Sequence, residues 1–135
     1  MIKLLIFDLD GTLVDSALDI IISANHVIES YDRPILSFDQ IREYIGDGLK
    51  PFVRGLAGDL ADDEEFVKEA SDRFMTHYDT QLLKNTVFYP GCREFLQSFL
   101  NVPTNKIGVV TNKPEGQARL ILKELGFSAS SFVEI

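Results

Sequence analysis

The chain has 135 residues, of which 45% are apolar and 25% are charged, and it carries a formal net charge of -8 at pH 7. This composition is typical of a globular domain, and the acidic balance argues against a nucleic-acid partner, because phosphate backbones require clustered Lys and Arg. No apolar run is long enough for a membrane span or a signal peptide, and a single cysteine excludes an internal disulfide framework. We therefore expect a soluble, cytoplasmic protein with no membrane partner.

Two apolar segments predict strands of a parallel sheet. Residues 2–7 (IKLLIF) are rich in β-branched and aromatic side chains and lack polar alternation, which is typical of a strand buried on both faces. Residues 106–110 (KIGVV) form a second such segment, and both segments end at polar residues. Residues 132–135 predict the start of a third strand.

Residues 15–85 predict a block of four helices without a strand. Three pairs of polar residues at capping-box spacing mark helix starts: Ser16 with Asp19, Ser37 with Gln40, and Asp62 with Glu65. A short helix is expected after Asp47. The last helix of the block carries an apolar stripe at helical spacing, which we expect to be buried: Phe66, Ala70, Phe74, Tyr78 and Leu82.

The pattern then alternates between helix and strand. A turn at 89–91 (YPG) precedes a helix over 92–99, and a further helix follows the second strand and ends at Gly126. The order strand, helical block, helix, strand, helix predicts an α/β fold in which an all-helical segment is inserted after the first strand of a parallel sheet. The expected boundaries are 1–14 and 86–135 for the sheet domain and 15–85 for the insertion.

Two acidic residues separated by one leucine follow the first strand. Residues i and i+2 of an extended chain project to the same side, so Asp8 and Asp10 are expected to face one point, with Leu9 in the core. Adjacent carboxylates repel each other unless a cation neutralises them or one holds a proton. Mg²⁺ prefers oxygen ligands and leaves room for a phosphate, and a carboxylate can attack phosphorus to give an aspartyl phosphate. The pair therefore predicts phosphoryl transfer at the carboxyl end of the sheet.

Neighbouring residues suit the same chemistry. Gly11 allows a sharp turn that brings backbone amides near phosphoryl oxygens. Thr111 and Asn112 follow the second strand and are expected to donate hydrogen bonds to those oxygens. The alternative for the acidic pair is an ordinary turn or helix cap, which also uses aspartate and glycine.

Four short segments carry a family resemblance. They are FDLDGTLVDS at 7–16, IGDG at 45–48, YPG at 89–91 and VTNKP at 110–114. These segments resemble the haloacid dehalogenase superfamily and, within it, the phosphoglycolate phosphatase-like branch. The resemblance covers essentially the whole chain. It implies a Rossmann-like core, a mobile helical cap formed by residues 15–85, and Mg²⁺-dependent transfer through a phospho-aspartate.

The resemblance also implies roles for matching residues. Asp8 would be the nucleophile and a metal ligand. Asp10 would be the acid–base group, and its backbone carbonyl would bind the metal. Five further residues are expected at the phosphate: Gly11, Thr12, Thr111, Asn112 and Lys113. For Lys113, a solvated position at a helix start is favoured over a role as the site's cation.

The chain also departs from the family pattern. The family places a further lysine and an acidic pair that completes the metal site after the Thr-Asn motif, and Ile135 is reached before either. We therefore expect an N-terminal fragment with an incomplete core and with weak or absent hydrolysis. Its first strand would have an unpaired edge, which favours self-association.

The leading prediction is a Mg²⁺-dependent phosphomonoesterase acting on a small phosphorylated metabolite, with 2-phosphoglycolate as the expected substrate. The alternative is a non-catalytic fragment or interaction module that retains half of the phosphatase site. A phospho-acceptor signalling domain also gathers carboxylates at strand tips. Such domains, however, place the accepting aspartate on a later strand and have no helical insertion after the first.

Overall fold

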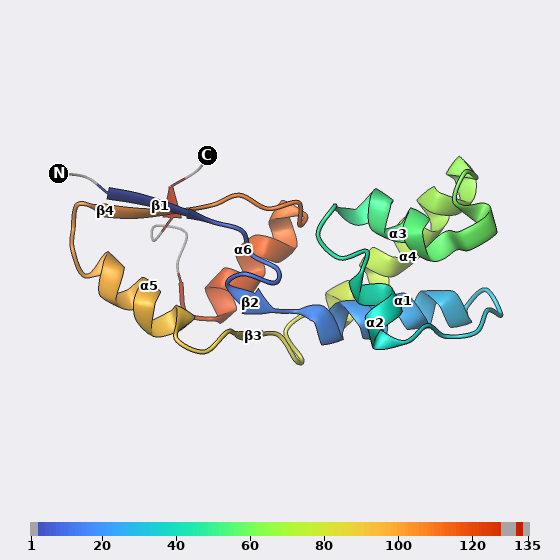
Figure 1. The fold of residues 1–135 in the computed structure, drawn as a ribbon, viewed down its shortest axis with the longest axis horizontal. Coiled ribbons are helices and arrows are strands. Elements are labelled where there is room, and N and C mark those ends of the chain that lie inside the picture. The colour runs from blue at the N-terminus through green and yellow to red at the C-terminus, as the bar shows by residue number, and fades with distance from the viewer. Residues whose placement is uncertain (1–2, 128–131, 134–135) are drawn as a thin grey trace.

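A computed structural model describes residues 3–127 and 132–133 and confirms the predicted α/β fold class (Figure 1). A parallel sheet has the strand order β1-β4-β5, formed by β1 (Lys3–Phe7), β4 (Asn105–Val109) and β5 (Phe132–Val133). In the β1–β4 pair, Phe7 lies opposite Val109. Strand β4 begins and ends one residue earlier than predicted, and positions 134–135 of the expected third strand lie outside the described residues.

Helices cover one face of this sheet. In the described ranges, α5 (Cys92–Leu100) and α6 (Glu115–Glu124) both lie beneath the sheet in Figure 1, with a buried apolar core against it. Leu4 and Ile6 of β1 are 48% and 54% exposed. The prediction that the first strand is buried on both faces is therefore wrong. The physical reason is that, within the described residues, helices pack on one face of the sheet, so alternate side chains of β1 project away from them.

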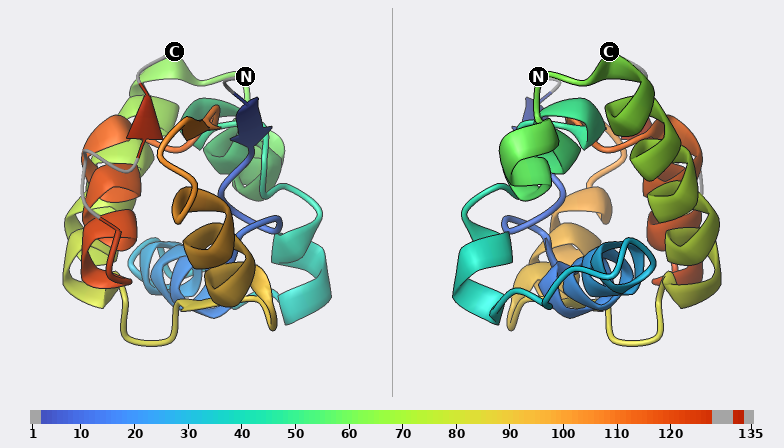
Figure 2. Two further views of the ribbon diagram at one scale, coloured as in Figure 1. Left: turned by 90° about the vertical axis from the view of Figure 1, so that its left-hand side faces the viewer. Right: turned by 90° about the vertical axis from the view of Figure 1, so that its right-hand side faces the viewer.

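The insertion is entirely helical and has its own apolar core. It consists of α1 (Ala17–Glu29), α2 (Phe38–Arg42), α3 (Leu49–Ala57), the 3₁₀ turn η1 (Gly58–Leu60) and α4 (Glu64–Gln81). Helix α4 packs against both α1 and α3 (Figure 2). Of the predicted stripe on α4, Ala70, Phe74 and Tyr78 are buried, and Phe66 and Leu82 are partly buried. None of the helices in the described ranges is long and apolar enough to cross a membrane.

The predicted helix starts have different outcomes. The capping box of Ser37 and Gln40 is confirmed at the start of α2. Helix α4 is capped one residue later than predicted, by Asp63, whose carboxylate accepts the backbone N–H groups of Glu65 and Phe66 at 3.0 Å each. The box predicted for Ser16 and Asp19 is wrong, because both side chains bind other partners.

Within residues 3–127 the chain crosses between the sheet domain and the helical insertion twice. The first crossing contains β2 (Val14–Asp15), and the second contains β3 (Val87–Phe88). The two short strands pair in antiparallel orientation, with Val14 opposite Phe88. Figure 1 shows this ribbon between the two parts of the molecule. The two connections are therefore held together by backbone hydrogen bonds.

Asp19 fastens the second crossing to α1. Its carboxylate is fully buried and accepts the backbone N–H groups of Asn85 (3.0 Å) and Thr86 (2.9 Å). It also accepts the side-chain donors of Gln81, Asn85 and Thr86 at 3.1, 2.8 and 2.7 Å. Burial raises the pKa of Asp19, but the hydrogen bonds from these three residues outweigh it and hold the pKa below the usual value. The residue therefore acts as a buried anion at the junction.

Asp19→Asn is expected to lower the free energy of unfolding by about 2–4 kcal/mol, because it removes an acceptor from several buried donors. Urea denaturation measures the change. Asp72→Asn is the matched control, since Asp72 pairs with Lys68 on the exposed surface of α4 and should cost less than about 0.5 kcal/mol. Equal losses in the two variants would contradict the role of Asp19.

The difference in stability between the wild type and Asp19→Asn is expected to depend on pH. The native pKa of Asp19 lies below its ordinary value of 3.8, so its contribution is present above that pH and is lost as the pH falls through the native pKa. The stability difference between wild type and Asp19→Asn should be steady from neutral pH to about pH 5 and shrink below about pH 4. A difference that persists unchanged in strong acid would rule this out.

Candidate active site

The residues after β1 form a tight turn anchored by Leu9. The Leu9 side chain is fully buried, and its carbonyl accepts the backbone N–H groups of Leu13 (3.0 Å) and Val14 (3.1 Å). Gly11 has a φ of 77°, a left-handed conformation that favours glycine, and its N–H donates to the Val14 carbonyl at 2.9 Å. The turn therefore fixes the backbone of Asp10 at the carboxyl end of the sheet.

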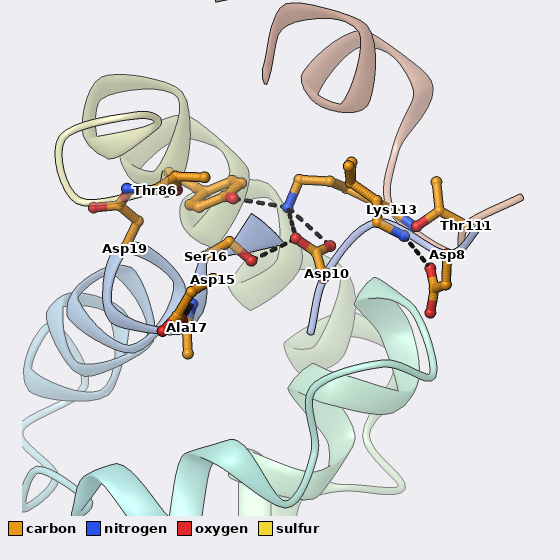
Figure 3. A network of polar contacts seen from close by, with 11 residues as sticks. Asp8, Asp10, Asp15, Ser16, Ala17, Asp19, Thr86, Thr111 and Lys113 are labelled. Atoms are coloured by element: carbon orange, nitrogen blue, oxygen red, sulfur yellow. Dashed lines mark hydrogen bonds and ion pairs between the residues drawn. The ribbon is translucent and has the colours of Figure 1, made fainter. Parts of the chain in front are cut away.

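Asp10 is held by two side chains, Ser16 and Lys113. Its Oδ1 accepts the Ser16 hydroxyl at 2.5 Å, and both of its carboxylate oxygens lie 3.1 Å from Lys113 Nζ. The side chain of Asp10 is 13% exposed and that of Lys113 is 4% exposed. Figure 3 shows the carboxylate of Asp10 between Ser16 and Lys113. Ser16 therefore supports Asp10 rather than capping the helix that follows.

Lys113 is buried, and the prediction that it is a solvated residue at a helix start is wrong. Its backbone N–H donates to Thr111 Oγ1 at 3.2 Å, and its side chain extends toward Asp10, as Figure 3 shows. Burial lowers the pKa of Lys113, and the negative charge of Asp10 opposes that change. The reason for the burial is the ion pair, which compensates for loss of water around the ammonium group.

Tyr78 brings the helical insertion to this ion pair. Its hydroxyl accepts a hydrogen bond from Lys113 Nζ at 2.7 Å, and Nζ lies 4.7 Å from the centre of the ring. Burial, followed by the charge of Asp10, raises the pKa of Tyr78 well above its usual range. The residue therefore stays a neutral phenol. The apolar stripe predicted its burial, but not its polar contact.

Asp8 lies close to this network without joining it. Its side chain is exposed, and its Oδ1 accepts the backbone N–H of Leu9 at 2.6 Å. In Figure 3 the carboxylate of Asp10 points toward Lys113, whereas that of Asp8 points to the other side of the turn. The expectation that the two carboxylates face one point is therefore not met, although both residues line one cleft.

That cleft lies between the end of the sheet and the helical insertion. It has an empty volume of about 560 Å³, part of it open to solvent. The sheet domain contributes Asp8, Asp10, Thr111, Asn112, Lys113 and Pro114. The insertion contributes a mostly apolar wall of Ile20, Ile45, Gly46, Gly48, Leu49, Phe52, Phe74, Met75 and Tyr78. The cleft therefore has one polar end and one apolar side.

The other predicted phosphate-binding residues are placed differently. Thr111 and Asn112 line the cleft, and the Asn112 side-chain amide donates to the Gly46 carbonyl of the insertion at 2.8 Å. Gly11 and Thr12 lie in the adjacent turn but are not among the described residues that line the cleft. The structure thus brings together five of the predicted residues: Asp8, Asp10, Thr111, Asn112 and Lys113.

The site offers part of a magnesium shell. No group of three or more acidic, histidine or cysteine side chains converges within the described residues. The exposed carboxylate of Asp8 is a suitable oxygen ligand, because Mg²⁺ binds proteins through one or two carboxylates and keeps several waters. The side chain of Asp10 is already committed to Lys113 and Ser16. Of the two carboxylates, that of Asp8 is therefore the one available as a Mg²⁺ ligand.

The arrangement combines groups that phosphoryl transfer requires. An accessible carboxylate is a potential nucleophile, a second carboxylate nearby can move protons, and a buried ammonium can stabilise a phosphoryl oxygen. All three lie at the carboxyl end of parallel strands, where ligands bind in open α/β sheets.

Comparison with known proteins identifies the family. Residues 5–133 match the haloacid dehalogenase-like hydrolase family. The chain therefore belongs to this family, which confirms the resemblance found in its motifs.

Several similar proteins within this family are named phosphoglycolate phosphatases. A phosphoglycolate phosphatase from Pseudomonas savastanoi is 35% identical over a 127-residue alignment that covers 91% of this chain and 46% of the relative. Another, from Colwellia psychrerythraea, is 35% identical over 92% of this chain and 57% of its own length. The solved structure of a predicted phosphoglycolate phosphatase from Haemophilus somnus has a TM-score of 0.87 and 29% identity, covering 98% of this chain and 61% of that one. The chain thus spans about half the length of the curated relatives it matches.

Proposed function

We propose that the chain hydrolyses phosphate monoesters of small metabolites through a phospho-aspartate on Asp8, with 2-phosphoglycolate as the first substrate to test. The observation that carries the proposal is the placement of Asp8, Asp10 and Lys113 in one cleft of a haloacid dehalogenase-like hydrolase. The relatives named phosphoglycolate phosphatases guide the choice of substrate. We also propose that residues 15–85 form a cap over the active site and that the protein is cytoplasmic.

The proposed reaction has two steps. A carboxylate oxygen of Asp8 forms a bond to phosphorus while the bond to the ester oxygen breaks, and Asp10, which starts the cycle as a carboxylic acid, gives its proton to the leaving alkoxide. Water then attacks the phosphorus of the aspartyl phosphate, Asp10 takes a proton from that water, and inorganic phosphate leaves. During both steps Thr111 would donate a hydrogen bond to a phosphoryl oxygen, and the positive charge of Lys113 would stabilise the phosphoryl group. Gly11, Thr12 and Asn112 remain predicted phosphate contacts.

Magnesium would bind next to the nucleophile. The Asp8 carboxylate and the Asp10 backbone carbonyl would hold the ion. Bound there, Mg²⁺ would neutralise negative charge on the carboxylate and the phosphate. The chain's own contribution is to keep the Asp10 side chain away from the metal, through its contacts with Ser16 and Lys113.

Asp8→Asn is expected to reduce kcat by about 1,000-fold or more, because an amide oxygen is a poor nucleophile toward phosphorus. Phosphate release from 2-phosphoglycolate and p-nitrophenyl phosphate in Mg²⁺ measures the change, and a chelator should abolish the wild-type rate. Asp39→Asn, at an exposed position on α2 outside the cleft, should retain the wild-type rate. Full turnover by Asp8→Asn would refute the assignment of the nucleophile.

A second candidate function is association with another copy through the face and edge of β1 that no other described residue covers. The observation that favours it is the exposure of Leu4 and Ile6 on the edge strand of the described sheet. Contiguous exposed apolar side chains and unpaired strand edges are typical of interaction sites.

Ile6→Lys is expected to weaken self-association by about tenfold or more, because it places a charge in an apolar contact. Sedimentation velocity over a concentration series measures the assembly. Val102→Lys is the matched control, since Val102 is similarly exposed but follows α5. A wild-type chain that stays monomeric at every concentration would exclude this function.

A further inference from the structure

Tyr78 takes no part in the proposed phosphoryl transfer, yet its hydroxyl reaches the partner of the acid–base residue. The ring lies within the apolar core of the insertion, stacked on Phe74 with ring centres 5.5 Å apart, and the whole residue is 2% exposed. Only its polar end extends beyond that core, to Lys113. A phenylalanine would fill the same apolar space, so the hydroxyl needs a separate explanation.

The Lys113 ammonium group is bound from two sides. An ammonium carries three N–H donors. Those of Lys113 are directed at the two carboxylate oxygens of Asp10, 3.1 Å away, and at the Tyr78 hydroxyl, 2.7 Å away. Because the side chain is 4% exposed, water takes little part in holding it. The position of the charge is therefore set by one contact from the sheet domain and one from the insertion.

Tyr78 is well suited to fix that position. It belongs to α4, an 18-residue helix packed against both α1 and α3. A phenol on a packed helix has few alternative rotamers, so its oxygen is a fixed point for a flexible lysine. Without it, the ammonium group would be held by Asp10 alone and would follow that carboxylate whenever it moved.

We propose that Tyr78 is a positioning residue, whose hydroxyl holds the Lys113 ammonium group at the phosphoryl site while Asp10 exchanges protons with the leaving group and water. This inference rests on the proposed function. It adds a residue from the helical insertion to a set that otherwise comes from the sheet domain. It also means that the Lys113 ammonium group is held from both sides only when the insertion lies against the sheet.

The test is Tyr78→Phe, which removes one oxygen and keeps the ring. We expect kcat and kcat/KM for p-nitrophenyl phosphate to fall together by about tenfold, with KM changed less than about twofold, because the lost hydrogen bond to a charged group acts on the reacting geometry. Rates are expressed per folded molecule, using circular dichroism to measure the folded fraction. A merely structural role would lower the melting temperature and leave kcat unchanged.

Tyr31→Phe is the matched control. Tyr31 lies in the same helical insertion, packs against Phe66, and has a buried hydroxyl for which no hydrogen-bond partner is found within the described residues. Its loss should leave kcat and KM at the wild-type values. If the wild type is active and Tyr78→Phe keeps the full kcat, the positioning role is wrong and the proposed function stands. A wild-type chain that releases no phosphate would overturn the proposed function and this role with it.

Discussion

The buried ammonium group of Lys113 is the constraint around which the cleft is built. A charge that is 4% exposed is costly unless opposite charge and hydrogen-bond acceptors replace water. Asp10 supplies the charge, Tyr78 supplies a further acceptor, and Ser16 holds Asp10 from the opposite side. These three come from the turn after β1, from α4 and from the first crossing. One side chain therefore ties together segments that are far apart in the sequence.

Much of the fold could be predicted from the spacing of apolar residues and from the residues that cap helices. The apolar segments predicted β1 and β4, and the helical spacing of residues 66–82 predicted the buried side of α4. The capping box at Ser37 was found as predicted, since cap and helix lie within one short segment. Burial of β1 on both faces was predicted wrongly, because burial depends on which elements lie across the sheet, and a strand's own residues do not contain that information.

The candidate site was only partly predictable for a related reason. Its motifs identified Asp8, Asp10 and Lys113, but the contacts among them depend on tertiary structure. Ser16 and Asp19 have the spacing of a capping box, yet each has a stronger partner supplied by folding: Asp10 for the hydroxyl, and the 85–86 backbone for the carboxylate. A buried carboxylate must be satisfied by hydrogen bonds, and this requirement outweighs a local capping contact.

The paired crossings also determine how the two parts can move. Because β2 and β3 are hydrogen-bonded to each other and Asp19 fastens the second crossing to α1, sliding or separation of the connections would break several buried bonds. Bending across the ribbon would leave most of these bonds intact, so the paired crossings favour rotation of the two parts over sliding, at the cost of the Lys113–Tyr78 and Asn112–Gly46 contacts. In the proposed reaction, substrate entry and product release would then depend on the same rotation. A substitution at the ribbon would alter both rates together, even though no atom in the cleft had changed.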